Sequence, residues 1–560
     1  MRDAGNRQAW FARPCVTGCC WPLFVWASRR RGWPSFTPAT IGRLCHRPAL
    51  SGDLYQRGFL SKPGGGSYNQ GVVWMVLSAC LPAGPALIHS LWARIEQGIW
   101  AVQGIRWQDL MWLFLVWLCV ERGIAAAAEP PPPAGPLARY VAQPDASYAW
   151  QVRRRGQVSR SEYVELTLHS QTWRDIAWKH QLFLVKPSTM PATASHAMLC
   201  IVGGSWKDEY AQPAAADERL PDDATLFANL AETLKTPVAV LLQVPHQPIF
   251  DGQFEDQAIS YTFEQFLKTG DPQWPLLLPM VKSAVRGMDA TEEFCGQEWS
   301  LSLKSFTVTG ASKRGWTTWL TAAVDRRVTA LAPMVIDVLN MSPQMEHQRR
   351  AWGKLSYKIS DYSDRNLIAQ LESPAGKALR SIVDPYSYRQ RLKQPKLIII
   401  GTNDHYWPLD ALNLYWQDLQ GPKYILYVPN NRHGLKDLGR VFGSLRALHR
   451  HAVDGQPLPQ LTWKLEPDAR GVQLELRSDI RPDQVQAWVA TSPTRDFREA
   501  RFRSVTLQRT GDAYRYQRPR PAEGYLALFG EALYNGDAVP SFFSTNVEIV
   551  AAQQDASQTP

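Results

Sequence analysis

A serine flanked by two glycines is the first feature of this sequence that could carry chemistry. It lies in Gly310–Gly315, with the letters G-A-S-K-R-G, between a strand-like apolar run at Ser305–Thr309 and a run with helical spacing. A tight turn from strand to helix strains the serine backbone, exposes its hydroxyl and places a helix N-terminus beside it. The pattern is one residue wider than the usual G-x-S-x-G. We therefore predict a nucleophile at Ser312, with an ordinary turn that contains a serine as the alternative.

A nucleophilic serine needs a base, and the base needs an acid to orient it. Asp404 follows the apolar run Lys396–Ile400, and His433 follows the apolar run Tyr424–Val428. The order serine, acid, histidine is that of α/β-hydrolases, and the carboxyl ends of parallel strands meet at one edge of a sheet. The sequence therefore predicts a catalytic triad of Ser312, Asp404 and His433.

Other residues compete for these roles. Asp337, which ends the apolar run that begins at Ala330, is an alternative acid. His405 stands beside Asp404 as an alternative base or substrate contact, and His246 either lines the same edge or fills a loop.

An oxyanion hole needs two backbone N–H groups aimed at the developing negative charge. One is expected from the residue after the nucleophile, Lys313, and the second from the loop that follows an earlier strand. Gly203–Trp206, with the letters G-G-S-W, follows such a strand, and Gly204 permits a close backbone approach. This chemistry requires neither a metal ion nor an organic cofactor, and we expect none.

The elements that position these residues are apolar runs separated by helical stretches. Continuous apolar runs are typical of strands buried on both faces, and their alternation with helices predicts an α/β fold with a mostly parallel sheet. These runs are Ala197–Val202, Val238–Val244, Ser305–Thr309, Ala330–Val338, Lys396–Ile400 and Tyr424–Val428. We assign residues 129–455 to an α/β-hydrolase-like domain with a helical cap inserted at about 341–392. Short alternating runs in residues 456–553 predict a small C-terminal β-sandwich.

Charge and cysteine are distributed unevenly. Residues 1–128 hold 13 Lys and Arg against 5 Asp and Glu, so they carry +8 of the net +10 of the 560-residue chain. The nearly neutral remainder offers no broad phosphate-binding surface, and we expect no nucleic-acid partner. Only Cys200 and Cys295 of the 8 cysteines lie beyond residue 128, which excludes a disulfide-dense scaffold.

The N-terminal 128 residues are expected to lie outside the folded body. Residues 1–70 lack a steady period and are predicted to be poorly ordered, with a small cysteine-rich metal module as the alternative. Leu110–Val120 is an apolar run too short to span a bilayer, and Ala125–Ala128 supplies small residues for cleavage. We predict a signal peptide at about residues 106–128, with a buried helix as the alternative. The protein is then exported to the periplasm or the extracellular space and meets the membrane only during export.

Several motifs resemble one family, the PhoPQ-activated pathogenicity-related proteins, whose relatives include eukaryotic autocrine proliferation repressor proteins. The resemblance covers roughly residues 137–550. Its motifs are Asp145–Trp150, Gln243–Pro248, Thr309–Leu320, Asp325–Val328, Val335–Asn340, Gly401–Trp407 and Asn430–Gly434. It implies an exported α/β-hydrolase-like protein but supplies no physiological substrate.

Two functions from different classes follow. The first is an exported serine hydrolase that cleaves ester or peptide bonds in a small molecule or a peptide. The second is a non-catalytic exported binding or signalling protein on the same scaffold, with the C-terminal β-sandwich as a surface for a protein partner. An intact triad favours the first, although a fold alone does not imply a function.

Overall fold

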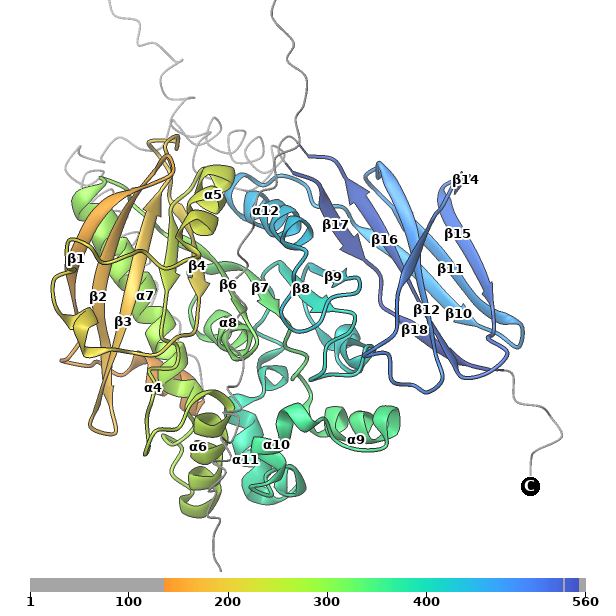
Figure 1. The fold of residues 1–560 in the computed structure, drawn as a ribbon, viewed down its shortest axis with the longest axis horizontal. Coiled ribbons are helices and arrows are strands. Elements are labelled where there is room, and N and C mark those ends of the chain that lie inside the picture. Colours follow the sequence, from red (N-terminus) through yellow and green to blue (C-terminus); the bar gives the residue numbers. More distant parts are fainter. Residues whose placement is uncertain (1–134, 537–538, 553–560) are drawn as a thin grey trace, which may run out of the picture. The chain divides into compact units, whose positions relative to one another are not determined.

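The computed structural model describes residues 135–536 and 539–552 (Figure 1). The predicted N-terminal segment of residues 1–128, including its signal peptide, lies outside this range. In the described part of the chain, no helix has both the length and the apolar character needed to cross a membrane.

Six parallel strands form the centre of a large sheet and carry the predicted site residues at their carboxyl ends. All six are almost completely buried, which explains why most of their residues are apolar. In spatial order they are β5 (Val238–Leu241), β4 (His196–Ile201), β6 (Ser305–Ala311), β7 (Val328–Met334), β8 (Lys396–Gly401) and β9 (Lys423–Val428). The predicted α/β-hydrolase-like fold class is confirmed.

Three long antiparallel strands extend the sheet beyond β5. They are β1 (Ala149–Val158), β2 (Ser161–Trp173) and β3 (Ile176–Lys186), and β3 pairs antiparallel with β5. These strands carry polar residues on part of their surface, so apolar runs alone underestimate their length.

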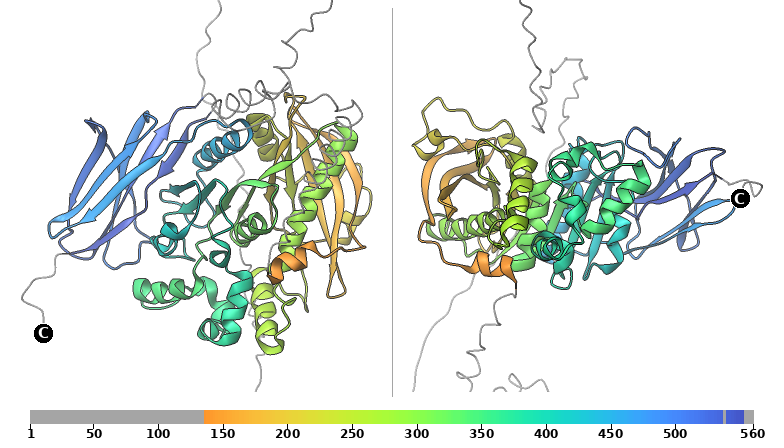
Figure 2. Two further views of the ribbon diagram at one scale, coloured as in Figure 1. Left: turned by 180° about the vertical axis from the view of Figure 1, so that it is seen from behind. Right: turned by 90° about the horizontal axis from the view of Figure 1, so that it is seen from below.

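Helices cover both faces of the central sheet (Figure 2). On one face, α5 (Ala224–Leu234) and α12 (Leu438–Asp454) pack over the parallel strands. On the other face, α7 (Leu277–Glu298) packs beside α8 (Lys313–Val324). The apolar residues of each face form a separate buried cluster, and this is the layered arrangement expected for a parallel sheet.

The predicted cap is helical. Between β7 and β8 the chain forms α9 (Met341–Trp352), α10 (Ser360–Ser363) and α11 (Pro374–Val383). Both α10 and α11 contact α6 (Glu255–Thr269), which follows β5, at the edge of the sheet where the parallel strands end (Figure 1).

The C-terminal strands form two antiparallel layers around a separate apolar cluster, which is the predicted sandwich. One layer holds β10 (Leu461–Pro467), β11 (Gly471–Ser478), β14 (Arg509–Thr510) and β15 (Ala513–Pro519). The other holds β12 (Gln484–Ser492), β13 (Arg503–Thr506), β16 (Tyr525–Tyr534), β17 (Ser541–Ser544) and β18 (Glu548–Ala551).

The second layer continues the central sheet, because Ser544 of β17 pairs with Ile425 of β9. The last two strands, β17 and β18, both pair with β16. The domain limits at residues 128/129 and 455/456 stay predictions.

Candidate active site

Ser312 occupies the sharp turn between β6 and α8. Its backbone has φ 57° and ψ −126°, and its N–H donates to the Met334 carbonyl at 2.9 Å. A positive φ is rare for a residue with a side chain and costs on the order of 1–3 kcal/mol. Although Ser312 is the N-cap of α8, its side chain makes no capping hydrogen bond. The hydroxyl is therefore left available in a half-buried position.

The two glycines of the motif are required for close packing. A Cβ on Gly310 would lie 2.7 Å from the Arg314 carbonyl oxygen, and a Cβ on Gly315 would lie 2.7 Å from Ile336 Cγ2. Both distances are too short for real atoms, so β6 and α8 can pack this tightly only with glycine at both positions. The extra residue in the motif places the second glycine against the segment that follows β7.

Asp404 and His433 are joined at the ends of neighbouring strands. His433 Nδ1 lies 2.8 Å from Asp404 Oδ2, and the Tyr406 N–H donates to Asp404 Oδ1 at 2.8 Å. The Asp404 side chain is 2% exposed, so both of its oxygens are committed inside the protein. An ionised Asp404 fixes the imidazole tautomer with the proton on Nδ1, which leaves Nε2 as the proton acceptor.

The imidazole is also held by an aromatic ring. Tyr406 stacks on His433 with a ring separation of 4.2 Å and an interplanar angle of 29°. His433 Nε2 is shielded from solvent and has no hydrogen-bond partner among the described residues. No hydrogen bond joins it to the Ser312 hydroxyl in that part of the chain, and such contacts often tighten only when substrate is bound.

The alternative acid, Asp337, has different partners. It lies beyond the end of β7 and accepts a hydrogen bond from the Tyr415 hydroxyl at 2.5 Å. Burial raises the pKa of Asp337 to about 7, against the opposing effect of this hydrogen bond. Asp404, and not Asp337, is the carboxylate that contacts His433.

The alternative histidines are engaged elsewhere. His405 Nδ1 lies 2.8 Å from the Tyr357 hydroxyl, while His246 Nδ1 lies 3.1 Å from the Lys179 carbonyl and its ring packs on Trp206. Neither contacts Asp404 through its ring.

The two predicted oxyanion donors lie in a loop with an unusual backbone and at the start of a helix. Gly204, in the loop after β4, has φ 117°, a conformation that residues with side chains rarely adopt. Lys313 is the first residue of α8, where backbone N–H groups lack a partner within the helix. Among the described residues, neither N–H donates a hydrogen bond.

The Lys313 side chain is buried in a cluster of charges, not directed at solvent. Its ammonium lies 2.9 Å from Glu255 Oε2 and 3.2 Å from Asp256 Oδ2, and only 4% of the side chain is exposed. Burial opposes the charge, but the Asp256 and Glu255 carboxylates outweigh this effect and raise the pKa of Lys313. Burial likewise opposes the charge on Glu255, yet Arg314 and Lys313 hold the pKa of Glu255 far below its usual range.

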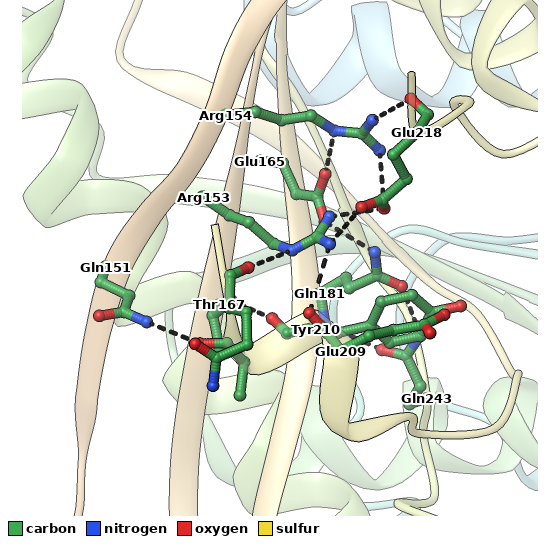
Figure 3. Close-up of polar contacts among 12 residues, drawn as sticks. Gln151, Arg153, Arg154, Glu165, Thr167, Gln181, Glu209, Tyr210, Glu218 and Gln243 are labelled. Atoms are coloured by element: carbon green, nitrogen blue, oxygen red, sulfur yellow. Dashed lines mark hydrogen bonds and ion pairs between the residues drawn. The ribbon is translucent and has the colours of Figure 1, made fainter. Parts of the chain in front are cut away.

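A second polar network lies on the side of the antiparallel strands (Figure 3). It supports Gly203–Trp206, the loop after β4, which we call the glycine loop. Arg153 donates to the fully buried Glu165 at 2.9 Å, and Gln181 donates to the same carboxylate at 2.6 Å. Gln243 donates to Gln181 at 2.8 Å through its side chain and to the Gly203 carbonyl at 2.9 Å through its backbone.

The same network holds the segment that follows the glycine loop. Arg153 and Arg154 both pair with Glu218, and Arg153 also donates to the Gln212 carbonyl at 3.0 Å (Figure 3). The loop after β4 is therefore fixed to strands β1–β3 at several points.

The family assignment follows from comparison with known proteins. A model of the PhoPQ-activated pathogenicity-related protein family matches residues 137–498, well over half of the chain. The chain belongs to this family. The matched range includes every residue predicted for the site. Autocrine proliferation repressor protein A of Dictyostelium discoideum is 32% identical to this family member over 436 residues, which are 71% of this chain and 86% of the relative.

Solved esterase structures are more distant from this PhoPQ-related protein. The acetyl xylan esterase of Paenibacillus sp. R4 is 14% identical with a TM-score of 0.37, over 53% of this chain and 86% of the esterase. Acetyl xylan esterase 1 of Thermoanaerobacterium sp. JW/SL YS485 is 14% identical with a TM-score of 0.36, over 57% of this chain and 92% of the esterase. Similarities of this size say nothing about the reaction, and the fold assignment rests on the strand order described above.

The sequence patterns assigned no role in the site to Glu255, Gln247 or Tyr406 of this PhoPQ-related protein. One signal was available: Lys313 and Arg314 are adjacent cations at the start of a buried helix, so they require carboxylate partners. The described residues contain no cluster of three or more His, Cys, Asp or Glu side chains arranged to hold a metal ion.

Proposed function

We propose that this protein is an exported serine hydrolase that cleaves ester or peptide bonds through Ser312, His433 and Asp404. The observation that carries the proposal is the strained serine turn at the end of β6, together with a partly buried Asp404–His433 pair in the loops after β8 and β9. These strands lie in one parallel sheet, so the three side chains approach the same edge.

The mechanism follows from these roles. Ser312 Oγ attacks the substrate carbonyl carbon while His433 Nε2 takes the hydroxyl proton, and Asp404 stabilises the resulting imidazolium. The carbonyl oxygen becomes an oxyanion that accepts hydrogen bonds from the Lys313 and Gly204 N–H groups. Collapse of this intermediate expels the alcohol or amine, which receives the proton from His433, and leaves an acyl group on Ser312.

Water completes the cycle. His433 takes a proton from water as the oxygen attacks the acyl carbonyl, and then returns that proton to Ser312 Oγ when the acid product leaves. The substrate is a small-molecule ester or a peptide, and every proton transfer uses a group of this chain.

Steady-state hydrolysis tests the proposal. The substrates are p-nitrophenyl esters of acetate, butyrate and octanoate, together with short peptide p-nitroanilides. We expect turnover by the wild type and a fall of about 10³-fold or more in kcat for Ser312→Ala, because the nucleophile is lost. Equal background rates for the folded wild type and Ser312→Ala on every substrate would contradict the proposal.

Export is the second part of the proposal and rests on the apolar run Leu110–Val120 and the alanines at 125–128. A fusion of residues 1–135 to a reporter that is active only outside the cytoplasm tests it. We expect reporter activity and cleavage near Ala128, both lost when Leu113 and Leu115 are replaced by arginine. An inactive, uncleaved fusion would contradict export.

A further inference from the structure

Glu255 lies where three elements of the candidate oxyanion hole meet. It is the first residue of α6, and its carboxylate pairs with Arg314 through both oxygens, at 2.6 and 2.8 Å. It also lies 2.9 Å from the Lys313 ammonium. One carboxylate therefore pairs with both of the cations that directly follow Ser312.

Gln247 connects the same carboxylate to the glycine loop. Its Nε2 group donates to Glu255 Oε1 at 2.7 Å and to the Gly204 carbonyl at 3.0 Å. Its Oε1 atom accepts from the Glu255 N–H at 2.9 Å. Gln247 is 3% exposed, so water does not replace these bonds at low cost.

Arg314 makes a second connection between the same elements. Its Nε donates to the Val244 carbonyl at 2.5 Å, and its guanidinium lies directly against Gly203. A Cβ on Gly203 would lie 2.5 Å from Arg314 Nη2, so the guanidinium fills the space where a side chain would be. The start of α8 and the glycine loop are thus joined twice, and Glu255 takes part in both connections.

From these contacts we infer that Glu255 is a positioning residue that holds the Lys313 and Gly204 N–H groups at a fixed separation. The inference rests on the proposed function, because it assigns the oxyanion donors of that reaction. Preorganised donors stabilise the oxyanion strongly since they need not reorient when charge develops. A mispositioned pair would bind substrate normally and stabilise the transition state poorly.

The chain offers a matched control on the same helix. Glu264 lies on α6, its side chain is 25% exposed like that of Glu255, and it also pairs with two cations, Lys268 at 2.9 Å and Arg365 at 2.8 Å. It contacts neither the glycine loop nor α8. Glu255→Gln and Glu264→Gln therefore remove the same charge from the same helix with different consequences for the oxyanion donors.

The test measures ester hydrolysis by the whole protein and inhibition by a trifluoromethyl ketone and its methyl ketone analogue. The trifluoromethyl ketone forms a tetrahedral adduct with Ser312 that carries an oxyanion, whereas the methyl ketone binds as a ground-state carbonyl. For Glu255→Gln we expect kcat to fall roughly 10- to 100-fold with KM within about threefold of wild type. The inhibition constant of the trifluoromethyl ketone should rise by the same factor, and that of the methyl ketone should stay unchanged.

Gln247→Met provides a second test in case Glu255→Gln does not fold. This variant removes the hydrogen bond to the Gly204 carbonyl and leaves the ion pairs of Glu255 intact. We expect it to shift the trifluoromethyl ketone constant in the same direction by roughly 3- to 30-fold. Suppose that the wild type is active and that Glu255→Gln and Glu264→Gln both have its kcat and its inhibition constants. The inference is then overturned, while the proposed function stands. An inert wild type would overturn the proposed function and the inference with it.

Discussion

The two sides of Ser312 are held by different kinds of contact. On the oxyanion side, defined as Gly203–Trp206 with Glu255, Lys313 and Arg314, largely buried ion pairs join the elements. On the base side, defined as Asp404, Tyr406 and His433, these residues are joined by one carboxylate, one backbone N–H and a stacked ring.

This difference matches what each side must do during turnover. Backbone donors keep their charge and position throughout the reaction, so strong ion pairs can fix them without cost to the chemistry. The imidazole gains and loses a proton in every cycle, and additional fixed charges beside it would favour one protonation state. An aromatic ring orients the imidazole with little effect on its charge.

Removing the base should have the largest effect. His433→Ala is expected to lower kcat about 10³- to 10⁴-fold, because the Ser312 hydroxyl loses its proton acceptor. The double variant with Ser312→Ala should be no worse than either single variant, since the residues act as a unit. Stopped-flow or long-time ester assays measure the residual rates, and additive losses would contradict a shared role.

Distorting the oxyanion side should have the next largest effect. Gly204→Ala is expected to lower kcat roughly 10- to 100-fold, because a Cβ at φ 117° strains the loop that carries one donor. Gly511→Ala, in the turn between β14 and β15 with φ 65° and open space around it, is the control. It should lose stability without losing activity. Equal activity of the two variants would show that Gly204 does not belong to the oxyanion hole.

Weakening the base side should have a smaller effect. Tyr406→Leu removes the ring stack, which contributes about 0.5–1.5 kcal/mol, so kcat should fall roughly 2- to 12-fold. Tyr406→Phe keeps the stack and should retain more activity than Tyr406→Leu. A Phe variant as impaired as the Leu variant would assign the effect to the hydroxyl instead.

The alternative acid should have the smallest effect on activity. Asp337→Asn is expected to stay within about twofold of wild type, whereas Asp404→Asn should lose about 10³-fold or more, though no more than His433→Ala, because the imidazole tautomer is no longer fixed. The opposite ranking, measured as kcat at pH 7.5, would assign the acid role to Asp337.

Asp337 should instead govern stability against pH. Its folded pKa, about 7, lies above the ordinary value of 3.8, so the native state binds this proton more tightly than the unfolded chain. Its contribution to the free energy of unfolding is therefore greatest below pH 4 and declines as the pH rises from about 4 to 7. Asp337→Asn should flatten this decline, by on the order of 1–4 kcal/mol between pH 4 and 8, in urea unfolding.

The parts of the site that could be predicted from the sequence share one property. Ser312, Asp404 and His433 each follow, within the loop at its carboxyl end, a strand that is largely buried and therefore mostly apolar. Such strands can be recognised in the sequence as runs of apolar residues. The topology of a parallel sheet then brings their carboxyl ends to one edge.

The parts that escaped prediction depend on contacts between distant segments. Glu255 and Lys313 are far apart in sequence and meet only because α6 and α8 begin at the same edge of the sheet. The pairing of Ser544 with Ile425 is an edge-to-edge contact, which no local pattern specifies. Asp337 lies past the end of β7 because the strand stops at Met334, although the apolar residues continue.

Covalent labelling of the full chain by a fluorophosphonate, mapped by peptide mass spectrometry, tests the central claim most directly. The account predicts a single phosphonylated residue, Ser312, with no adduct in Ser312→Ala and strongly slowed labelling in His433→Ala. A folded wild type that stays unlabelled, or that carries its adduct on another residue, would contradict the assignment of Ser312 as the nucleophile. A non-catalytic binding or signalling role on this scaffold would then be the better explanation of an unlabelled protein.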